Sequence, residues 1–296
     1  MSSPLLSIVF LNFNRLNETQ FTVEQLRKQC SQRDDIEIIA VDNGSVDGTA
    51  EYLQQQTDII SLCLDDNTGI AGYNQGFELA TGRYILVLDD DSCLDSLQSI
   101  DNSLQLLENS PKIGLIACHI ETPDGLPQWS WHLPINQQSG ESPFFIGCGF
   151  IIRRELFKKI GWYPADFFLY QNEVAVSFEV RRQGYDIVYD SQCLIIHRGR
   201  PNQRPGWRRV FFPTRNTLWL LRGYYPQPQA SYLIFSRLII GLIRAITFGE
   251  VKTYLKAVGE GLTQPIQKTP LSAEIRQHCL PFWKQNSLIH QLLKRT

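Results

Sequence analysis

The chain has 296 residues, 43% of them apolar, and a formal net charge of −2, so it can bury the core of one large domain or of two. Its seven cysteines are widely spread and show no C-x-x-C spacing, which argues against a disulfide framework or a zinc site and indicates a reducing compartment. The first residues, MSSPLLSIVFLNFNR, carry no basic region and no small-residue cleavage site, so we expect a β-strand there rather than a signal peptide.

Apolar runs of strand length alternate with helical patterns through the first 120 residues. The expected strands are 7–13, 36–42, 58–64, 83–88 and 112–120, and the expected helices lie near 17–30, after 47–49, through 73–80 and near 96–108. This alternation predicts an α/β fold with a parallel sheet covered by helices on both faces. Ligands of such sheets bind beyond the carboxyl ends of the strands, where Asp42 and Asp89–Asp91 both fall.

The pattern changes after Glu121. We expect a strand at 144–154, a short helix at 154–161, a helix at 172–184 that ends at Gly184, and two short strands at 186–190 and 193–198. Residues from about 230 to the end have a mostly helical pattern. We therefore divide the chain into an α/β domain, 1–225, and a C-terminal helical region, 226–296.

Charge is distributed unevenly between the two parts of the chain. Residues 1–190 carry 27 acidic and 12 basic side chains, whereas residues 191–296 carry 3 acidic and 16 basic ones. This asymmetry suggests an anionic partner for the C-terminal third: a nucleic acid, the phosphates of a small ligand or a membrane surface. A solvated basic face is the alternative. The acidic first 190 residues and the lack of any nucleic-acid motif argue against a nucleic-acid-binding protein.

Residues 232–248 form an apolar stretch that is short and charged for a membrane span. Arg237 and Arg244 are seven residues apart, so on a helix they share one face. This pattern fits a helix that lies in the membrane interface with its arginines toward the head groups. It also fits a helix packed on its own domain or in a dimer.

The stretch RYILVLDDD ends an apolar strand with three consecutive carboxylates, Asp89, Asp90 and Asp91. Like charges placed this close cost free energy unless a cation or many donors compensate them. Carboxylates at a strand end suit Mg²⁺ or Mn²⁺ bridging to phosphate oxygens. The alternative is a solvated turn with a helix N-cap. It accounts for one of the three aspartates, but less easily for all three.

Two glycine-containing loops follow strands, VDNGSVDGT at 41–49 and NTGIAGYNQG at 67–76. The first is a strand–turn–helix in which Ser45, Asp47 and Thr49 cap a helix that can attract an anion or serve structure alone. The second allows close approach of the backbone to a ligand. Neither is the G-x-G-x-x-G dinucleotide fingerprint, and no G-K-[ST] follows, which weakens dehydrogenase and kinase interpretations.

Two further residues have a possible chemical role. Glu173 stands at the start of a helix after an aromatic stretch, where a carboxylate of raised proton affinity can act as general base. An ordinary acid favoured by the helix dipole is the alternative. His197 ends a strand beside Arg198 and opens an acid-free basic segment, which strengthens the case for contact with phosphate or a metal. A structural histidine, the commoner role of a lone histidine, is the alternative.

Taken in order, six motifs resemble the inverting glycosyltransferases of family 2. They are SIVFLNFNR, IIAVDNGSVDGT, NTGIAGYNQGFELATGRYILVLDDD, FIGCGFIIRRELFKKIGWYP, FFLYQNE and LIIHR. The resemblance covers roughly residues 5–225 and implies a GT-A fold, a Rossmann-like, mostly parallel central sheet flanked by helices. Within the family, FFLYQNE and TRNTLWLLRGYYP look most like bacterial rhamnosyltransferase-like enzymes.

The resemblance also implies roles for single residues. The pocket for a dTDP- or UDP-sugar would be formed by Phe10, Asn12, Asp42, Asn67, Gly69, Asn74, Asp89 and Asp90. A Mg²⁺ or Mn²⁺ cofactor would be held by Asp91, Asp89 and His197. Glu173 would deprotonate the hydroxyl of a glycan or lipid-linked acceptor in one inverting displacement.

The chain departs from the family pattern after Glu173. Many relatives have E-D-x-D-L and a later arginine, where this chain has Asn172, Ala175 and Glu179. A catalytically degenerate relative that binds nucleotide sugar or glycan is therefore the alternative to an active enzyme. For the enzyme, we expect a cytoplasmic location, with peripheral contact to the inner face of the membrane, and a role in cell-surface polysaccharide synthesis.

Overall fold

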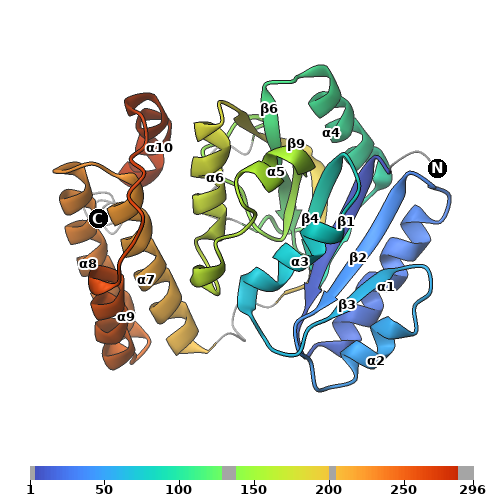
Figure 1. Cartoon of the computed structure of the whole chain (residues 1–296), viewed down its shortest axis with the longest axis horizontal. Helices are drawn as coiled ribbons and strands as arrows, with labels where there is room; N and C mark the ends of the chain where they lie inside the picture. The colour runs from blue at the N-terminus through green and yellow to red at the C-terminus, as the bar shows by residue number, and fades with distance from the viewer. Residues whose placement is uncertain (1–3, 129–137, 200–204, 286–296) are drawn as a thin grey trace. The chain divides into compact units, whose positions relative to one another are not determined.

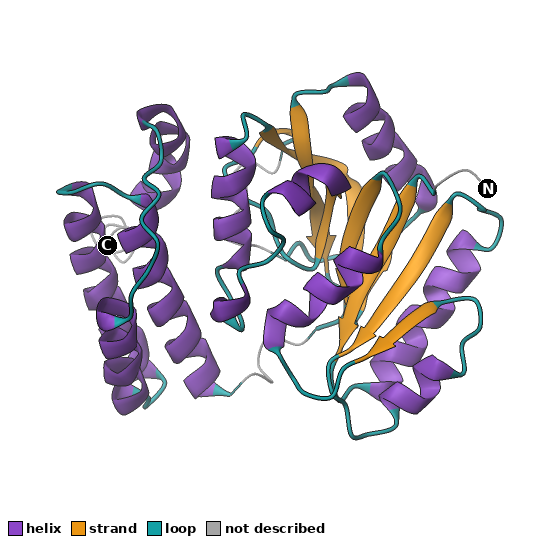
Figure 2. Cartoon of the chain, in the orientation of Figure 1, coloured by secondary structure: helices purple, strands orange, loops and turns teal. Residues whose placement is uncertain are grey.

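The computed structural model describes residues 4–128, 138–199 and 205–285. The chain divides into two compact units, the first comprising Met1–Asp166 with Glu179–Gly199 and the second Phe167–Phe178 with Arg200–Thr296. In the described part of the chain, all strands belong to the first unit and the second unit is helical (Figure 2). Sequence analysis placed the boundary near residue 225, whereas contacts assign residues 167–178 and 206–224 to the helical unit.

A nine-stranded mixed sheet forms the centre of the first unit among the described residues. Its order is β3-β2-β1-β4-β8-β6-β9-β5, and β7 pairs with β9. Pairing is parallel across β3, β2, β1 and β4, antiparallel on both sides of β8, and parallel again between β6 and β9. The strands are β1 (Leu6–Asn12), β2 (Ile36–Asp42), β3 (Ile60–Cys63), β4 (Tyr84–Asp89), β5 (Ser92–Leu94), β6 (Ile113–Glu121), β7 (Gly140–Glu141), β8 (Gly149–Arg153) and β9 (Asp186–His197).

Helices cover both faces of this sheet, as continuous apolar strands require. In Figure 1, α3 crosses in front of the strands and α1 lies behind them. Side chains of β1 and β4 are fully buried along most of each strand, which places the core in the middle of the sheet. The helices of this unit are α1 (Leu16–Cys30), α2 (Thr49–Gln54), α3 (Gly72–Leu79), α4 (Leu97–Asn109) and α5 (Arg154–Lys159), with the 3₁₀ turn η1 (Gly69–Ala71). The 3₁₀ turn η2 (Ala165–Phe167) and helix α6 (Asn172–Arg182) each include residues of both units.

The two short strands expected at 186–190 and 193–198 are one strand, β9. Its pairing with β6 shifts register between Cys118 and His119, so that Asp190 and Leu194 face neighbouring residues of β6. The intervening residues form a bulge, which the sequence pattern presents as a break between strands. The bulge lets a single strand continue to His197 at the edge of the candidate site.

Four helices make up most of the second unit: α7 (Gly206–Tyr224), α8 (Gln229–Thr247), α9 (Val251–Thr263) and α10 (Ala273–Gln285). A small apolar core of Val210, Ala245 and Tyr254 joins α7, α8 and α9. The buried Asn216 of α7 donates through its side-chain amide to the carbonyls of Phe167, Leu169 and Tyr170. These bonds attach the segment before α6 to the helical unit.

Helix α8 is the one described helix long and apolar enough to cross a membrane, judged by length and composition alone. Its residues Tyr232, Phe235 and Ile246 are each at least 60% exposed. Of the two arginines, Arg237 packs within the protein, with its guanidinium 4.9 Å from the centre of the Trp283 ring, whereas Arg244 is exposed. Burial of Arg237 lowers its pKa to about 10.

Candidate active site

The parallel register brings two of the predicted acidic groups to one edge of the sheet. Asn12 at the end of β1 is opposite Asp42 of β2, and Leu11 of the same strand is opposite Asp89 of β4. Asp42 and Asp89 are thus two strand spacings apart, about 10 Å. This is the edge at which ligands of parallel sheets bind.

The antiparallel strands bring further side chains to the same edge. Leu88 of β4 pairs with Gly149 of β8, so Cys148 follows on the side of Asp89. Ser92 pairs with His197 at the end of β9, next to Asp91. Segments far apart in the sequence therefore meet at the Asp89–Asp91 tip.

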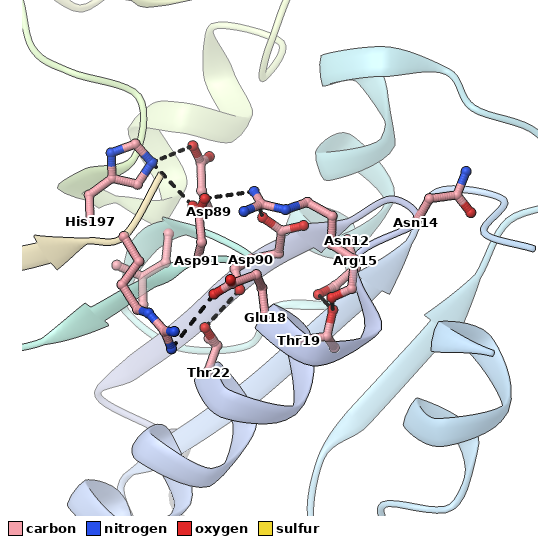
Figure 3. Close-up of polar contacts among 12 residues, drawn as sticks. Asn12, Asn14, Arg15, Glu18, Thr19, Thr22, Asp89, Asp90, Asp91 and His197 are labelled. Carbon is pink, nitrogen blue, oxygen red and sulfur yellow. Dashed lines mark hydrogen bonds and ion pairs between the residues drawn. The ribbon is translucent and has the colours of Figure 1, made fainter. Parts of the chain in front are cut away.

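Asp91 is buried between a guanidinium and an imidazole (Figure 3). Arg15 Nη1 donates to Asp91 Oδ2 at 2.6 Å and to Asp90 Oδ1 at 2.9 Å, so one nitrogen bridges two of the three carboxylates. His197 Nε2 lies 3.1 Å from Asp91 Oδ1 and 3.9 Å from Asp89 Oδ2. The tip is thus held by two side chains that oppose its charge.

These contacts separate the protonation of the neighbouring carboxyls. Burial and the adjacent Asp91 raise the pKa of Asp90 well above its usual value, although Arg15 opposes them. Burial would raise the pKa of Asp91 too, but His197 and Arg15 outweigh it and lower the pKa to about 2. Burial opposes protonation of His197, but Cys148, Asp91 and Asp89 outweigh it and raise its pKa to about 11.

Gln128 fixes the orientation of the His197 ring. Its side-chain amide nitrogen donates to the His197 carbonyl at 3.1 Å, and its oxygen accepts a hydrogen bond from His197 Nδ1 at 2.8 Å. Because an amide oxygen only accepts, Nδ1 carries a proton. Nε2 is thereby directed toward the aspartates. In metal sites, a second hydrogen-bond partner orients a ligand histidine in the same way.

The residues at this tip fit a divalent cation. A carboxylate oxygen of Asp89, the sulfur of Cys148 and a ring nitrogen of His197 lie within 4.8 Å of one another. The predicted ligands Asp89, Asp91 and His197 are brought together, and Cys148 joins them although the sequence did not suggest it. Arg15 and Gln128 are likewise additions from the structure.

The glycine loops form a second group at the same edge, near Asp42. Asp42 is 1% exposed, and its Oδ2 accepts a hydrogen bond from the Ser45 amide at 2.9 Å. Its other oxygen, Oδ1, is buried and has no hydrogen-bond partner among the described residues. Asn43 ties this turn to the second loop by donating to Asn67 Oδ1 and to the Gly69 carbonyl. A buried, unpaired carboxylate oxygen beside two glycine loops suits an N–H donor from a ligand.

Several predicted pocket residues have partners within the fold. Phe10 is fully buried in β1, and Asn12 donates to the Val41 carbonyl and accepts from Thr19 Oγ1. Asn74 exchanges two hydrogen bonds with the backbone of Tyr163. These side chains support the walls of the site, and their contact with a donor stays a prediction.

Glu173 belongs to the second unit, where it is half-buried on the first turn of α6. Its carbonyl accepts a hydrogen bond from Ser177 Oγ at 2.7 Å. Later on the same helix, Glu179 pairs with Arg182 at 3.0 Å, a local contact of the first unit. The role of Glu173 as general base stays a prediction.

The sequence model of glycosyl transferase family 2 matches residues 7–161, which include the strand-end aspartates, both glycine loops and Cys148. The chain belongs to this family. The match covers the half of the chain that holds most of the candidate site, and it bears out the resemblance inferred from the motifs.

Two relatives that match this chain are named as a polysaccharide synthase and a glycosyltransferase. Poly-β-1,6-N-acetyl-D-glucosamine synthase of Staphylococcus aureus is 29% identical over 183 residues, covering 52% of this chain and 40% of the synthase. Glycosyltransferase AglE of Haloferax volcanii is 22% identical over 257 residues, covering 76% of this chain and 83% of AglE. This chain thus spans less than half the length of the staphylococcal relative.

Solved structures share the fold. Mannosyltransferase PcManGT from Pyrobaculum calidifontis, in complex with GDP-Man and Mn²⁺, has a TM-score of 0.61 and 17% identity, covering 96% of this chain and 87% of that one. GalNAc-T7 with UDP, GalNAc and Mn²⁺ has a TM-score of 0.66 and 14% identity, covering 96% and 56%. The chain has the GT-A fold, with a C-terminal helical extension.

Proposed function

We propose that this chain transfers a sugar from a dTDP- or UDP-sugar to a hydroxyl of a glycan or glycolipid acceptor, in the synthesis of cell-surface polysaccharide. The observation that carries the proposal is that Asp42 and the Asp89–Asp91 tip lie at the same edge of the sheet. One group suits a nucleobase and the other a charged diphosphate. The naming of one relative as a poly-β-1,6-N-acetyl-D-glucosamine synthase supports the polysaccharide context.

On the nucleoside side, Asp42 would accept a hydrogen bond from an N–H group of the base through Oδ1, the oxygen that has no partner in the described part of the chain. Thymine and uracil carry such an imino N–H. The Asn43 bonds to Asn67 and Gly69 would keep the loop backbone close to the nucleotide. This arrangement would fix the orientation of the donor nucleotide, because its base would bind at β2 and its diphosphate at β4.

On the diphosphate side, Asp89, Asp91 and His197 would hold Mg²⁺ or Mn²⁺. When bound, the cation neutralises charge on the departing nucleoside diphosphate. Arg15 keeps Asp91 ionised and in place, and Gln128 keeps His197 Nε2 directed at the site. PcManGT and GalNAc-T7 were each solved with Mn²⁺, which supports a divalent cation here.

Glu173 would accept the acceptor's hydroxyl proton as that oxygen attacks the anomeric carbon on the face opposite the diphosphate. The bond from the anomeric carbon to the diphosphate oxygen breaks in the same displacement, so the configuration inverts. No covalent intermediate on the protein is required. A hexosyl or a rhamnosyl donor is compatible with this scheme.

The experiment compares the wild type with Asp91→Asn in transfer and in donor hydrolysis, using a panel of dTDP-, UDP- and GDP-sugars with Mn²⁺ or Mg²⁺. We expect a loss of about a hundredfold or more in rate, because electrostatic stabilisation of the departing group depends on this carboxylate. The matched control is Asp58→Asn, since Asp58 is exposed and its salt bridge among the described residues is to Arg27.

An unchanged rate in Asp91→Asn would contradict the assigned role of the cation site. Binding of a nucleoside diphosphate, seen as a raised melting temperature, without turnover of any donor would favour the degenerate, binding relative instead. Ala175 and Glu179, which replace the aspartate and arginine of many family members, motivate that alternative.

A further inference from the structure

Cys148 is the one residue of the candidate cation cluster that does not match hard-cation chemistry. Its sulfur lies within 4.8 Å of a carboxylate oxygen of Asp89 and of a ring nitrogen of His197. Mg²⁺ and Mn²⁺ prefer oxygen ligands, whereas thiolate and imidazole together favour Zn²⁺, Co²⁺ and other softer ions.

Cys148 is held in this place by the backbone that follows it. Gly149 opens β8 opposite Leu88, and a Cβ there would lie 2.6 Å from Ile120 Cδ1 and 3.0 Å from Ile195 Cγ1. The strand is therefore packed tightly against its neighbours, and the preceding residue has little freedom to move away. Cys148 itself is only 6% exposed, so its sulfur faces the interior of the site and not bulk water.

The number of protein ligands also matches that of a catalytic zinc site. Catalytic zinc sites use three protein ligands and leave a position open for water or substrate. Asp89, Cys148 and His197 supply one oxygen, one sulfur and one nitrogen, and the open position suits a diphosphate oxygen. Gln128, which accepts a hydrogen bond from His197 Nδ1 at 2.8 Å, orients the imidazole through the nitrogen that would not bind the metal, as second partners do around metal-bound histidines.

We propose that Cys148 is a thiolate ligand, and that Asp89, Cys148 and His197 form a site that selects Zn²⁺ or Co²⁺ over Mg²⁺. The inference rests on the proposed function only in taking this cluster as the cation site. On binding, the S–H bond of Cys148 and the N–H bond at His197 Nε2 would both break, the two protons would pass to solvent, and the freed sulfur and nitrogen would ligate the metal. The selectivity follows from the sulfur, because the oxygen and nitrogen ligands alone are compatible with Mn²⁺ and Mg²⁺ as well.

The test is an optical titration of the metal-stripped full chain with Co²⁺, without donor or acceptor. We expect a thiolate-to-cobalt charge-transfer band in the near ultraviolet that saturates at one Co²⁺ per chain. Cys148→Ser should abolish the band, whereas Cys63→Ser should keep it, because Cys63 is half-buried on β3 and outside the cluster. Zn²⁺ should displace Co²⁺ from the wild type at concentrations at least about tenfold below those of Mg²⁺.

Absence of the band in the wild type, or its persistence in Cys148→Ser, would overturn the proposal. Equal displacement of Co²⁺ by Zn²⁺ and Mg²⁺ would overturn it as well. Near-ultraviolet circular dichroism shows whether Cys148→Ser is folded, and His197→Gln provides a second variant that should lose the band. Because the titration contains no sugar, transfer is measured in a separate assay with donor and acceptor. A cobalt band with no transfer in that assay would reject the proposed function alone, and transfer without the band would reject this inference alone.

Discussion

The three consecutive carboxylates show how neighbouring residues accommodate closely spaced negative charge. Asp90 is buried and its pKa is raised, while Asp91 is ionised and lies between Arg15 and His197. The Asp90 carbonyl accepts a hydrogen bond from Thr22 Oγ1 of α1 at 2.7 Å, which fixes the backbone of the tip. Each aspartate thus has a different environment, and Arg15 is the contact that Asp90 and Asp91 share.

This arrangement predicts that Arg15→Gln destabilises the metal-free protein. Its loss leaves two buried carboxyls without their shared donor, so the free energy of unfolding should fall by about 1–3 kcal/mol. The matched control is Arg27→Gln, which breaks a pair whose aspartate is 51% exposed and should cost below about 1 kcal/mol. Urea unfolding followed by tryptophan fluorescence measures both. Equal losses of unfolding free energy in the two variants would show that the Arg15 contact with Asp90 and Asp91 stabilises the protein no more than an exposed ion pair does.

At the scale of elements, the close packing of α3 on β1 and β2 brings the second glycine loop to the edge of the sheet. A Cβ on Gly76 would lie 2.7 Å from Val41 Cγ2 and 3.0 Å from Val9 Cγ1. The helix can approach the strands this closely because Gly76 has no side chain. The position of the loop that begins α3, and with it Asn67 and Gly69, depends on this contact.

Gly76→Ala should therefore destabilise the first unit by about 1–3 kcal/mol, since the methyl group overpacks a filled interface. Gly259→Ala is the matched control, because this glycine of α9 has nothing within 4 Å of its Cβ position. There the higher helix propensity of alanine should leave stability unchanged or raise it by up to about 1 kcal/mol. Thermal unfolding monitored by circular dichroism compares the two. Similar melting temperatures for both variants would argue against close packing at Gly76.

At the scale of the whole molecule, an excess of positive charge and most of the exposed large apolar side chains both occur in the C-terminal third. Nine arginines and no acidic residue occur from Ser191 to Gly249. In the same segment, exposed apolar side chains recur at helical spacing on α8: Tyr232, Phe235, Leu242, Ile243 and Ile246. Apolar side chains with neighbouring basic groups suit the interface of an anionic membrane.

We expect the chain to bind vesicles that contain anionic lipid and to be released as salt rises from 0.1 to 1 M, where the screening length falls from about 10 to about 3 Å. Phe235→Ser with Ile246→Ser should weaken this binding by about tenfold or more, because two apolar side chains no longer enter the interface. Vesicle co-sedimentation measures it. Leu79→Ser, which removes an exposed apolar side chain 43% accessible on α3, is the control. Equal binding by all three proteins would exclude α8 as the contact.

Much of the first unit could be predicted from local sequence. The alternation of strands and helices indicated the α/β fold, and α1, α3 and α4 begin within a residue of their expected starts. The aspartates at the ends of β2 and β4 were identified because parallel strands place their carboxyl ends at one edge. These features depend on the spacing of apolar residues and on chain direction, which a sequence displays directly.

The family resemblance had already named His197 as a partner of those aspartates, but tertiary structure alone added Cys148, Arg15 and Gln128. Cys148 reaches the tip through antiparallel register, and Arg15 and Gln128 reach it from loops, so no local pattern reveals that they are neighbours. The assignment of residues 167–178 to the helical unit involves distant contacts in the same way, among them the bonds that Asn216 donates to carbonyls of this segment. The sequence by itself determined the family, the fold class and the acidic tip. The composition of the cation site was decided by pairings between distant segments, because register and packing are properties of the folded chain.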